Sequence, residues 1–378
     1  MATARLLLKR VKYLRGLSLP LFDLNPKESP KELFGREKEL DELVRLIKAR
    51  RWVAVLGPRM VGKTSLIKAA NKRIEDAGIR AVYVNLWGVN RAQGLLNALA
   101  LGLNSSKGLP QKIRDAVTRI EGVSFGPGGI SVSVPKKPMA TTFDLLATIG
   151  RQAVDCVIEL DEVQELAVIS AHLLKLLANI FNTSPNMVFV FTGSMFGLMK
   201  TLLEPGPSSP LYGRSPAKLY IGPFERERAA DFLRKGCGEH NVTVKEGGIS
   251  EIVERLDGIP GWLTLYGNNI AVRKLPPEKA LEETISEGVK IVKDELEHFL
   301  EGRDRDANLA ALKAAAVSAR WNEIKGAMEA RKGFAVNDAT VYNTLESLKA
   351  AMLIDEKEKV YRVNDPMLRT VLLTSQIA

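Results

Sequence analysis

The sequence contains few of the residues that build disulfide frameworks or metal clusters. Its 378 residues include two cysteines, Cys156 and Cys237, and three histidines, none of them at the spacing of a zinc site. This scarcity excludes a disulfide-stabilised secreted fold and a metal centre built on cysteine and histidine. Long hydrophobic runs are lacking as well, since none reaches the ~18 residues that a membrane-spanning helix requires. We therefore expect no membrane partner.

Positive charge is concentrated at the N-terminal end. The chain has a net charge of +10, and residues 1–31 hold seven Lys or Arg against two Asp or Glu, which is half of the excess. Apolar residues at helical spacing over 4–17 predict a basic amphipathic helix. Such an arm packs on the protein itself, or contacts a membrane surface or nucleic acid. Its basic residues interrupt any secretory signal, so we expect a cytoplasmic protein.

Alternating strand and helix patterns predict an α/β domain over residues 34–223. Helical patterns separate the first four of five apolar runs, which is typical of a five-stranded parallel sheet covered on both faces. A Gly-Pro-Gly-Gly turn between two alternating runs predicts a β-hairpin insert near 123–134. The hairpin either decorates the sheet or projects as a contact element, and we favour decoration. The five runs are Trp52–Leu56, Ala81–Leu86, Cys156–Leu160, Met187–Thr192 and Lys218–Ile221.

The remaining segments flank this core. Pro20, Pro26 and Pro30 predict an extended linker, so residues 1–33 are assigned to a basic helix and linker. Residues 224–300 show helical patterns without a convincing strand, which indicates a helical lid. Residues 301–378 combine three helical patterns with a possible β-wing, and we interpret them as a winged-helix domain.

A phosphate-binding loop follows the first apolar run directly. Residues 57–64 match G-x-x-x-x-G-K-[ST] between a strand and a helix, the order that a P-loop requires. Glycine lets backbone amides approach phosphate oxygens, and the helix N-terminus favours the negative charge. Lys63 can reach the β- and γ-phosphates, and the Thr64 hydroxyl can bind Mg²⁺. The predicted nucleotide contacts in this segment are Gly57, Pro58, Arg59, Met60, Val61, Gly62, Lys63, Thr64 and Ser65.

Two acids end the third apolar run, where a parallel sheet binds its ligands. We predict that Asp161 helps to hold Mg²⁺, directly or through water, and that Glu162 is the general base for the attacking water. Glu159 is expected on the opposite side of the strand or in a polar pocket, without a role. The fourth run ends in polar residues, and Thr192 or Ser194 could sense the γ-phosphate.

Two further motifs complete a family resemblance. Phe34-Gly35-Arg36-Glu37 resembles the Gly-Arg-Glu opening of the archaeal ATPase family within the STAND class of AAA-like P-loop NTPases. Gly258-Ile259-Pro260-Gly261 is similar to the Gly-x-Pro motif of that family's lid. The resemblance covers residues 34–275 and extends more loosely to the winged helix. It implies ATP or ADP with Mg²⁺ as ligands, Phe34, Gly35 and Arg36 against the base, and Pro260 near the adenine.

The resemblance also singles out one arginine. Arg214 follows Gly213 just before the fifth run, where the archaeal family often has Gly-Arg. This likeness implies an arginine that stabilises the γ-phosphate, and the alternative is a surface arginine. Many STAND proteins carry an arginine just after the fourth strand, and this sequence has none there. γ-Phosphate sensing would then depend on Arg214 or on a partner subunit.

These observations predict a slow or partner-stimulated ATPase that acts as a STAND-type switch. The alternatives are an ATP-regulated DNA-binding protein, acting through the winged helix and the basic arm, and a nucleotide-binding scaffold with little turnover. The winged helix could read DNA, but residues 301–378 hold twelve basic and eleven acidic residues, which is poor for phosphate neutralisation. We therefore favour a protein contact or self-association for this domain.

Overall fold

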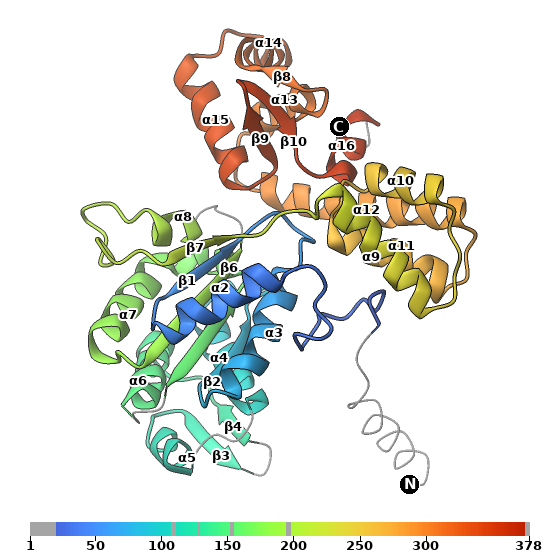
Figure 1. Cartoon of the computed structure of the whole chain (residues 1–378). Helices are drawn as coiled ribbons and strands as arrows, with labels where there is room; N and C mark the ends of the chain where they lie inside the picture. Colours follow the sequence, from blue (N-terminus) through green and yellow to red (C-terminus); the bar gives the residue numbers. More distant parts are fainter. Residues whose placement is uncertain (1–19, 107–110, 127–128, 152–154, 194–197, 375–378) are drawn as a thin grey trace.

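The computed structural model describes residues 20–106, 111–126, 129–151, 155–193 and 198–374. The helix expected at 4–17 lies outside these residues. The described chain forms an α/β core, a helical lid and a C-terminal domain, which stand as three lobes in Figure 1. The C-terminal domain follows directly from the last lid helix.

The core is a five-stranded parallel sheet, as the sequence predicts. Its strands are β1 (Val53–Leu56), β2 (Arg80–Asn85), β5 (Cys156–Asp161), β6 (Met187–Gly193) and β7 (Ala217–Tyr220), in the order β2-β5-β6-β1-β7. Every residue of β1, β5 and β6 is buried, which explains why their sequences are largely apolar. Because β1 lies between β6 and β7, the loop after β1 is close to the ends of the strands on both sides.

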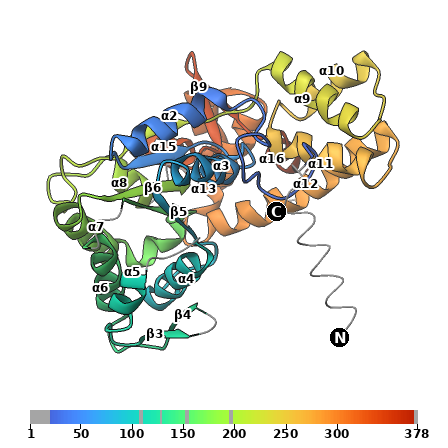
Figure 2. The same ribbon diagram turned by 60° about the horizontal axis from the view of Figure 1, so that its bottom comes forward.

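Helices cover the two faces of this sheet. Three helices pack next to β1 and β2, namely α2 (Glu37–Lys48), α3 (Lys63–Glu75) and α4 (Ala92–Ser105). The chain then continues through α5 (Gln111–Val117). The other core helices are α6 (Pro138–Gly150), η1 (Val163–Ile169), α7 (Ser170–Thr183) and α8 (Leu198–Leu203). The hairpin β3 (Val123–Gly126) and β4 (Gly129–Val132) packs against α4, at the end remote from the lid in both views (Figures 1 and 2).

One segment passes a simple test for a membrane span. Val163–Thr183 is long and apolar enough by length and composition, with a mean hydropathy of 1.4. In the fold it is η1 followed by α7, and its leucines Leu166, Leu173 and Leu177 are buried in the core of the α/β domain. Packing against the sheet accounts for this apolar composition.

The lid is a four-helix unit that includes a residue from the N-terminal segment. Its helices are α9 (Arg226–Glu239), α10 (Glu246–Arg255), α11 (Pro260–Ala271) and α12 (Pro277–Leu300). The expected linker over 20–31 is not a loose connection, because Phe22 is fully buried in the lid core. The Phe22 ring stacks on His240 at 5.9 Å and fills space that Gly236 and Gly267 leave open.

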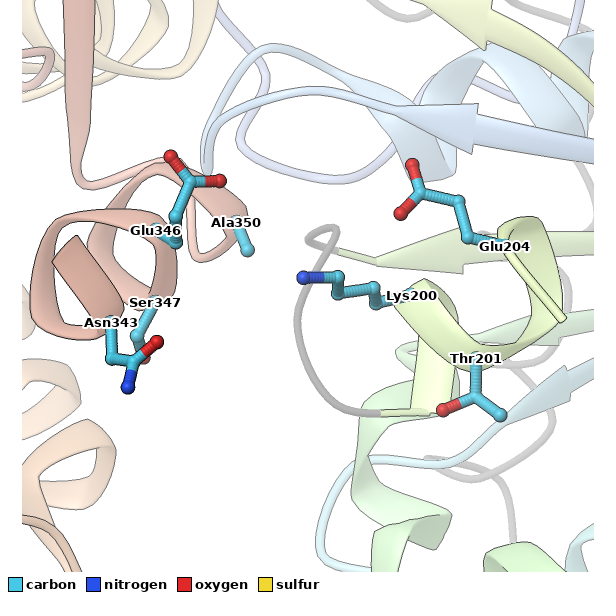
Figure 3. Close-up of a pocket in the computed structure, with 7 residues that line it drawn as sticks. All are labelled: Lys200, Thr201, Glu204, Asn343, Glu346, Ser347 and Ala350. Carbon is cyan, nitrogen blue, oxygen red and sulfur yellow. The ribbon is translucent and has the colours of Figure 1, made fainter. Parts of the chain in front are cut away.

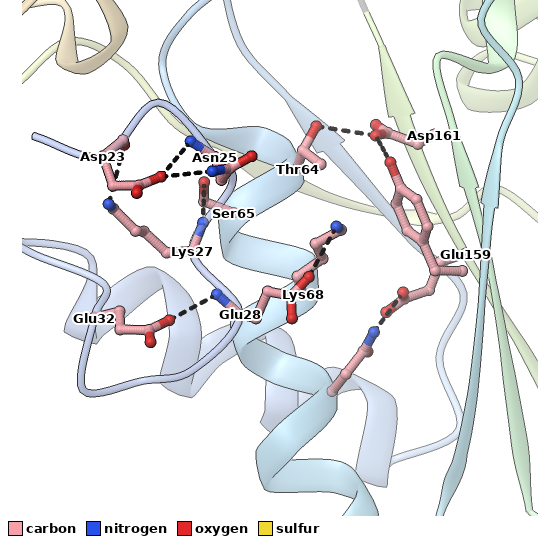
Figure 4. Close-up of polar contacts among 12 residues, drawn as sticks. Asp23, Asn25, Lys27, Glu28, Glu32, Thr64, Ser65, Lys68, Glu159 and Asp161 are labelled. Atoms are coloured by element: carbon pink, nitrogen blue, oxygen red, sulfur yellow. Dashed lines mark hydrogen bonds and ion pairs between the residues drawn. The ribbon is translucent and has the colours of Figure 1, made fainter. Parts of the chain in front are cut away.

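The same segment is also fixed to the core. Lys27 is buried, and its ammonium group donates to the carbonyl oxygens of Pro20 at 2.6 Å and Asp23 at 3.1 Å. The Lys27 backbone amide donates to Ser65 Oγ on α3 at 3.2 Å (Figure 4). Residues 20–33 therefore form a strap that joins the lid to the helix after the P-loop.

The C-terminal domain is a winged helix. Its helices are α13 (Arg305–Ala316), α14 (Trp321–Lys332), α15 (Asp338–Ala350) and α16 (Pro366–Leu373), with an antiparallel sheet of β8 (Ala319–Arg320), β10 (Val360–Val363) and β9 (Ile354–Lys357). Asn337 caps α15 by accepting from the Thr340 amide at 2.7 Å. The domain packs on the lid, where α16 lies against α12 and Met367 contacts Gly288.

Replacing Gly267 with alanine should detach the strap from the lid. A Cβ at this position would overlap the Phe22 ring, so Gly267→Ala should destabilise the chain by about 1–3 kcal/mol. The free energy of urea unfolding measures the effect. Gly238→Ala, on α9 with open space around its Cβ position, is the matched control and should be neutral or slightly stabilising. Equal stability of the two variants would contradict the burial of Phe22.

Candidate functional site

The P-loop joins β1 to α3 in a backbone conformation that depends on glycine. Gly62, the residue before α3, has φ +94, and Met60 has φ +63, so both lie in the left-handed region. A Cβ on Gly57 would overlap the backbone oxygen of Ile221 beyond β7. The turn therefore presents its amides, and the first N–H groups of α3, at the carboxyl edge of the sheet, which is the geometry for binding phosphate.

Lys63 is the buried cation of this loop. Its side chain is largely enclosed, and Nζ donates to the carbonyl oxygens of Gly57 and Pro58 at 2.8 Å each. Burial lowers the pKa of Lys63, while the nearby carboxylates of Glu162 and Asp161 act in the opposite direction. A triphosphate would add negative charge beside this ammonium group and favour its charged form.

Asp161 accepts hydrogen bonds from three hydroxyl groups. Thr64 Oγ1 on α3 donates to Oδ2 at 2.9 Å (Figure 4), the Tyr83 hydroxyl on β2 donates at 2.6 Å, and Thr192 on β6 donates to Oδ1. Burial, followed by the charge of Asp161, raises the pKa of Tyr83, so this phenol stays a donor. The sequence did not predict a role for Tyr83, because a single tyrosine within a strand does not by itself indicate a functional site.

The arrangement of Thr64 and Asp161 fits a hard divalent cation. Both predicted metal residues present oxygen atoms at one point beside the P-loop, and Mg²⁺ prefers one or two carboxylates plus substrate phosphates. Within the described residues, no group of three or more His, Cys, Asp and Glu is arranged to hold a metal ion by itself. The donors thus suit a metal that arrives with nucleotide.

Glu162 is held beside this centre in a strained conformation. It has φ +61, and its backbone amide donates to Thr192 Oγ1 at 3.1 Å, so Thr192 contacts both acids. The Glu162 carboxylate accepts a hydrogen bond from Gln164 Nε2. Gln164 is a second residue that sequence reasoning missed. The Gln164 side chain occupies space left by Gly193, where a Cβ would overlap Gln164 Oε1.

Glu159 lies on the same face of β5 as Asp161 and points into a polar pocket under α3. Asn71 Nδ2 donates to Glu159 Oε2 at 2.8 Å, and burial raises the pKa of Glu159 to about 8. Of the two positions considered for this residue, the structure shows the polar pocket (Figure 4). Strand alternation requires this result, because residues two apart share a face.

The motif at 34–36 lies beneath the P-loop. The Arg36 side chain is buried over the Phe224 ring at 4.7 Å and donates to the carbonyl oxygens of Val61, at 3.3 Å, and Gly222. The Phe34 ring contacts the Phe224 and Phe232 rings at the junction of core and lid. These side chains join the P-loop, the segment after β7 and the lid.

The lid motif reaches the P-loop directly. Pro260 is the first residue of α11, and the Gly261 amide donates to the Met60 carbonyl oxygen at 2.8 Å. A Cβ on Gly261 would lie 2.7 Å from the Met60 Cβ, so only glycine permits this approach. Arg59, the neighbour of Met60, forms an ion pair with Glu295 of α12. Lid and phosphate site are thus in contact at two consecutive P-loop residues.

Arg214, for which the sequence left open a γ-phosphate contact and a surface position, lies at the opposite edge of the sheet from the P-loop of its own chain. The Ala217 amide donates to the Trp52 carbonyl oxygen, so the segment before β7 lies beside the start of β1. The Arg214 guanidinium stacks on the Phe181 ring at 5.3 Å. Because the strands are parallel, a residue before β7 cannot reach the loop after β1. Ser194 lies outside the described residues.

A separate cleft of about 410 Å³ lies between α8 of the core and α15 of the winged helix (Figure 3). Lys200 extends across it from α8 toward α15. The helix that would read DNA therefore faces the core across this cleft. The residues around it are Lys200, Thr201, Glu204, Asn343, Glu346, Ser347 and Ala350.

Two family models match the chain. Residues 33–265 match an ATPase domain predominantly from Archaea, and residues 305–364 match the C-terminal winged helix-turn-helix domain of MCM proteins. Among curated proteins, none matches.

Solved structures show the same architecture. The Walker-type ATPase PABY2304 of Pyrococcus abyssi is 28% identical with a TM-score of 0.74, and the match covers 93% of this chain and 99% of that one. The ORC2 protein of Aeropyrum pernix, solved in ADPNP and ADP complexes, is 17% identical with a TM-score of 0.62, covering 94% and 96%. The ORC1 protein of the same organism, in complex with DNA, is 16% identical with a TM-score of 0.50, covering 94% and 97%.

These matches confirm the α/β P-loop core, the winged helix and the resemblance to archaeal ATPases. The matched ATPase domain spans the P-loop, the two acids after β5 and the lid motif of α11. The chain belongs to the family of ATPase domains found predominantly in Archaea, and it is a P-loop enzyme that binds and hydrolyses ATP.

Proposed function

We propose that this ATPase is a Mg²⁺-dependent switch of STAND type, whose nucleotide state sets the position of the lid and the winged helix. The observation that carries the proposal is the double contact between lid and P-loop, through Gly261 with Met60 and through Glu295 with Arg59. A change of charge in the loop must alter these contacts. The cytoplasmic location inferred from the sequence stays a prediction.

The residues of the site divide the chemistry among them. The amides of the P-loop and Lys63 would bind and orient the phosphates, and Thr64 with Asp161 would hold Mg²⁺, which neutralises charge on the β- and γ-phosphates. Glu162, next to that position, would take the proton of the attacking water while Gln164 fixes its carboxylate. Thr192, bonded to both acids, would keep their spacing.

Glu162→Gln should abolish most of the turnover while nucleotide still binds. Loss of a general base lowers a rate by about 10²–10⁴-fold, and the amide keeps the size of the side chain. Steady-state phosphate release and a nucleotide titration measure the two quantities. Glu165→Gln is the control, because that carboxylate accepts from the Gly88 amide outside the predicted chemistry. Equal rates for wild type and Glu162→Gln would exclude Glu162 as the base.

Arg214 belongs to a surface that a second chain could bring to the active site. It cannot serve the P-loop of its own chain, and the two described arginines that contact this loop, Arg36 and Arg59, are bound to the Val61 carbonyl oxygen and to Glu295. We propose that Arg214 acts in trans, on the γ-phosphate bound by a neighbouring copy. An arginine supplied in this way stabilises the charge of the transferring phosphoryl group.

Mixing two inactive variants tests this assignment. Arg214→Ala keeps an intact phosphate site, and Lys63→Ala keeps Arg214. Phosphate release should be low for each variant alone and should recover in the mixture, because a Lys63→Ala chain supplies the arginine that its partner lacks. Lys218→Ala, an exposed basic residue on the same β7 segment, is the control for surface charge. An impaired Arg214→Ala that no mixture rescues would contradict the trans assignment.

DNA binding is the second candidate function. Its support is the match to the MCM winged helix and the solved ORC1 relative in complex with DNA. Against it, the basic residues of α14 and α15 are paired with acids of the same domain, which weakens contact with phosphates. The pairs are Lys325–Asp338, Arg331–Asp306, Lys332–Asp304 and Lys349 with Glu346 and Glu356.

We therefore expect weak, sequence-independent DNA binding at most. Fluorescence anisotropy with duplex DNA, repeated across salt concentrations, should show no binding at physiological ionic strength. Tight binding that Tyr342→Ala removes would establish DNA recognition instead, because this exposed residue lies on α15. Tyr220→Ala, an exposed tyrosine of the core, is the matched control.

A further inference from the structure

Arg59 is the one charged side chain in the P-loop besides Lys63, and it leaves the loop toward the lid. Its Nε atom lies 2.5 Å from Glu295 Oε1 on α12, and its guanidinium lies 5.1 Å from the centre of the Trp87 ring, beyond β2. The side chain is 44% exposed. Three elements therefore meet at Arg59: the P-loop, the longest lid helix and the segment after β2.

Glu295 faces the phosphate site from the lid. Its side chain is only 25% exposed, and the charged groups around it are Arg59 and Lys63 of the P-loop, Glu162 after β5 and Asp365 before α16. Burial raises the pKa of Glu295 to about 7, and Arg59 opposes this shift. A carboxylate thus lies among the same groups that would surround a γ-phosphate, with Arg59 as its ion-pair partner.

A triphosphate and Glu295 compete for the same cation. Arg59 belongs to the loop that wraps the phosphates, and a guanidinium binds a phosphate through two parallel hydrogen bonds. The terminal phosphate carries more negative charge than a carboxylate, so it is the stronger partner. Once Arg59 turns to it, Glu295 loses its counter-ion beside a group of like charge, so it must take up a proton or move away, and either outcome ends the ion pair that joins α12 to the P-loop.

We propose that Arg59 senses the γ-phosphate in cis, exchanging Glu295 for the terminal phosphate of ATP and so releasing α12 from the P-loop. The inference rests on the proposed ATP switch and assigns to Arg59 and Glu295 the response to the γ-phosphate. ADP ends at the β-phosphate and leaves the Arg59–Glu295 pair in place. Release of α12 reaches the winged helix, because α12 packs on α16 and Trp262 of the lid donates to Asp365 at 3.0 Å.

Affinities for a non-hydrolysable ATP analogue and for ADP, both with Mg²⁺, test the exchange by calorimetry on the full chain. Arg59→Ala should weaken binding of the analogue by about 10–100-fold, the value of one charge-assisted contact, and leave ADP nearly unchanged. Glu295→Gln, which removes the competing charge, should strengthen binding of the analogue more than that of ADP. Arg91→Ala and Asp294→Asn, which change exposed residues of the same charge as Arg59 and Glu295, are the controls.

Trp87 supplies a readout that does not depend on affinity. If Arg59 leaves the Trp87 ring, the analogue should change tryptophan emission and ADP should not, and Trp87→Phe should remove the change. Buried Trp52 and Trp262 and half-buried Trp321 contribute a constant background.

The possible results distinguish failure of γ-phosphate sensing by Arg59 from failure of the proposed ATP switch as a whole. A wild type that binds neither nucleotide would overturn the switch itself. Binding of both nucleotides, with Arg59→Ala weakening them equally or not at all, would overturn only γ-phosphate sensing. If Arg59→Ala fails to fold, the same affinities can be measured on the double variant Arg59→Gln/Glu295→Gln, which removes both charges of the pair together. A preserved triphosphate preference in that double variant would also refute the exchange.

Discussion

The carboxylate of Asp161 is the constraint on which the site depends. A buried carboxyl group needs hydrogen bonds in place of its water, and here hydroxyls from α3, β2 and β6 provide them. These bonds fix the end of β5 against the P-loop helix and both neighbouring strands. The same hydroxyl of Thr192 then accepts from the amide of Glu162, so the two acids proposed for the metal and the base, Asp161 and Glu162, are positioned by one connected network.

The lid is coupled to this network at its edge. Its contacts with the P-loop include a backbone hydrogen bond at Met60, whose side chain packs against the lid core, and an ion pair at Arg59. Polar contacts of this kind are sensitive to local charge, whereas the apolar packing of α12 on α16 is not. A phosphate can therefore change how the lid meets the loop while lid and winged helix move together.

Local patterns predicted most of the fold, and contacts distant in sequence explain what they missed. Strand β1, the P-loop and α3 are encoded within about twenty-five consecutive residues, so their order was readable. Tyr83, Gln164 and Glu295 gained their positions from strands and helices far along the chain. The prolines before α2 predicted an extended linker, whereas the segment contains turns, and the space at Gly236 and Gly267 makes Phe22 part of the lid. The role of Arg214 was left open, although strand direction alone could have located it at the edge of the sheet opposite the P-loop.

The charges of the winged helix limit the ways in which this domain could transmit the nucleotide state. The basic side chains of α14 and α15 are paired with acids of the same domain, and the C-terminal half of α15 faces the core across a cleft. A domain arranged in this way gains little from phosphate contacts but loses buried surface when α16 leaves the lid. In the proposed switch, the free energy of nucleotide binding would pass through the α12–α16 packing, and the state of Arg59 would set the position of the winged helix relative to the core.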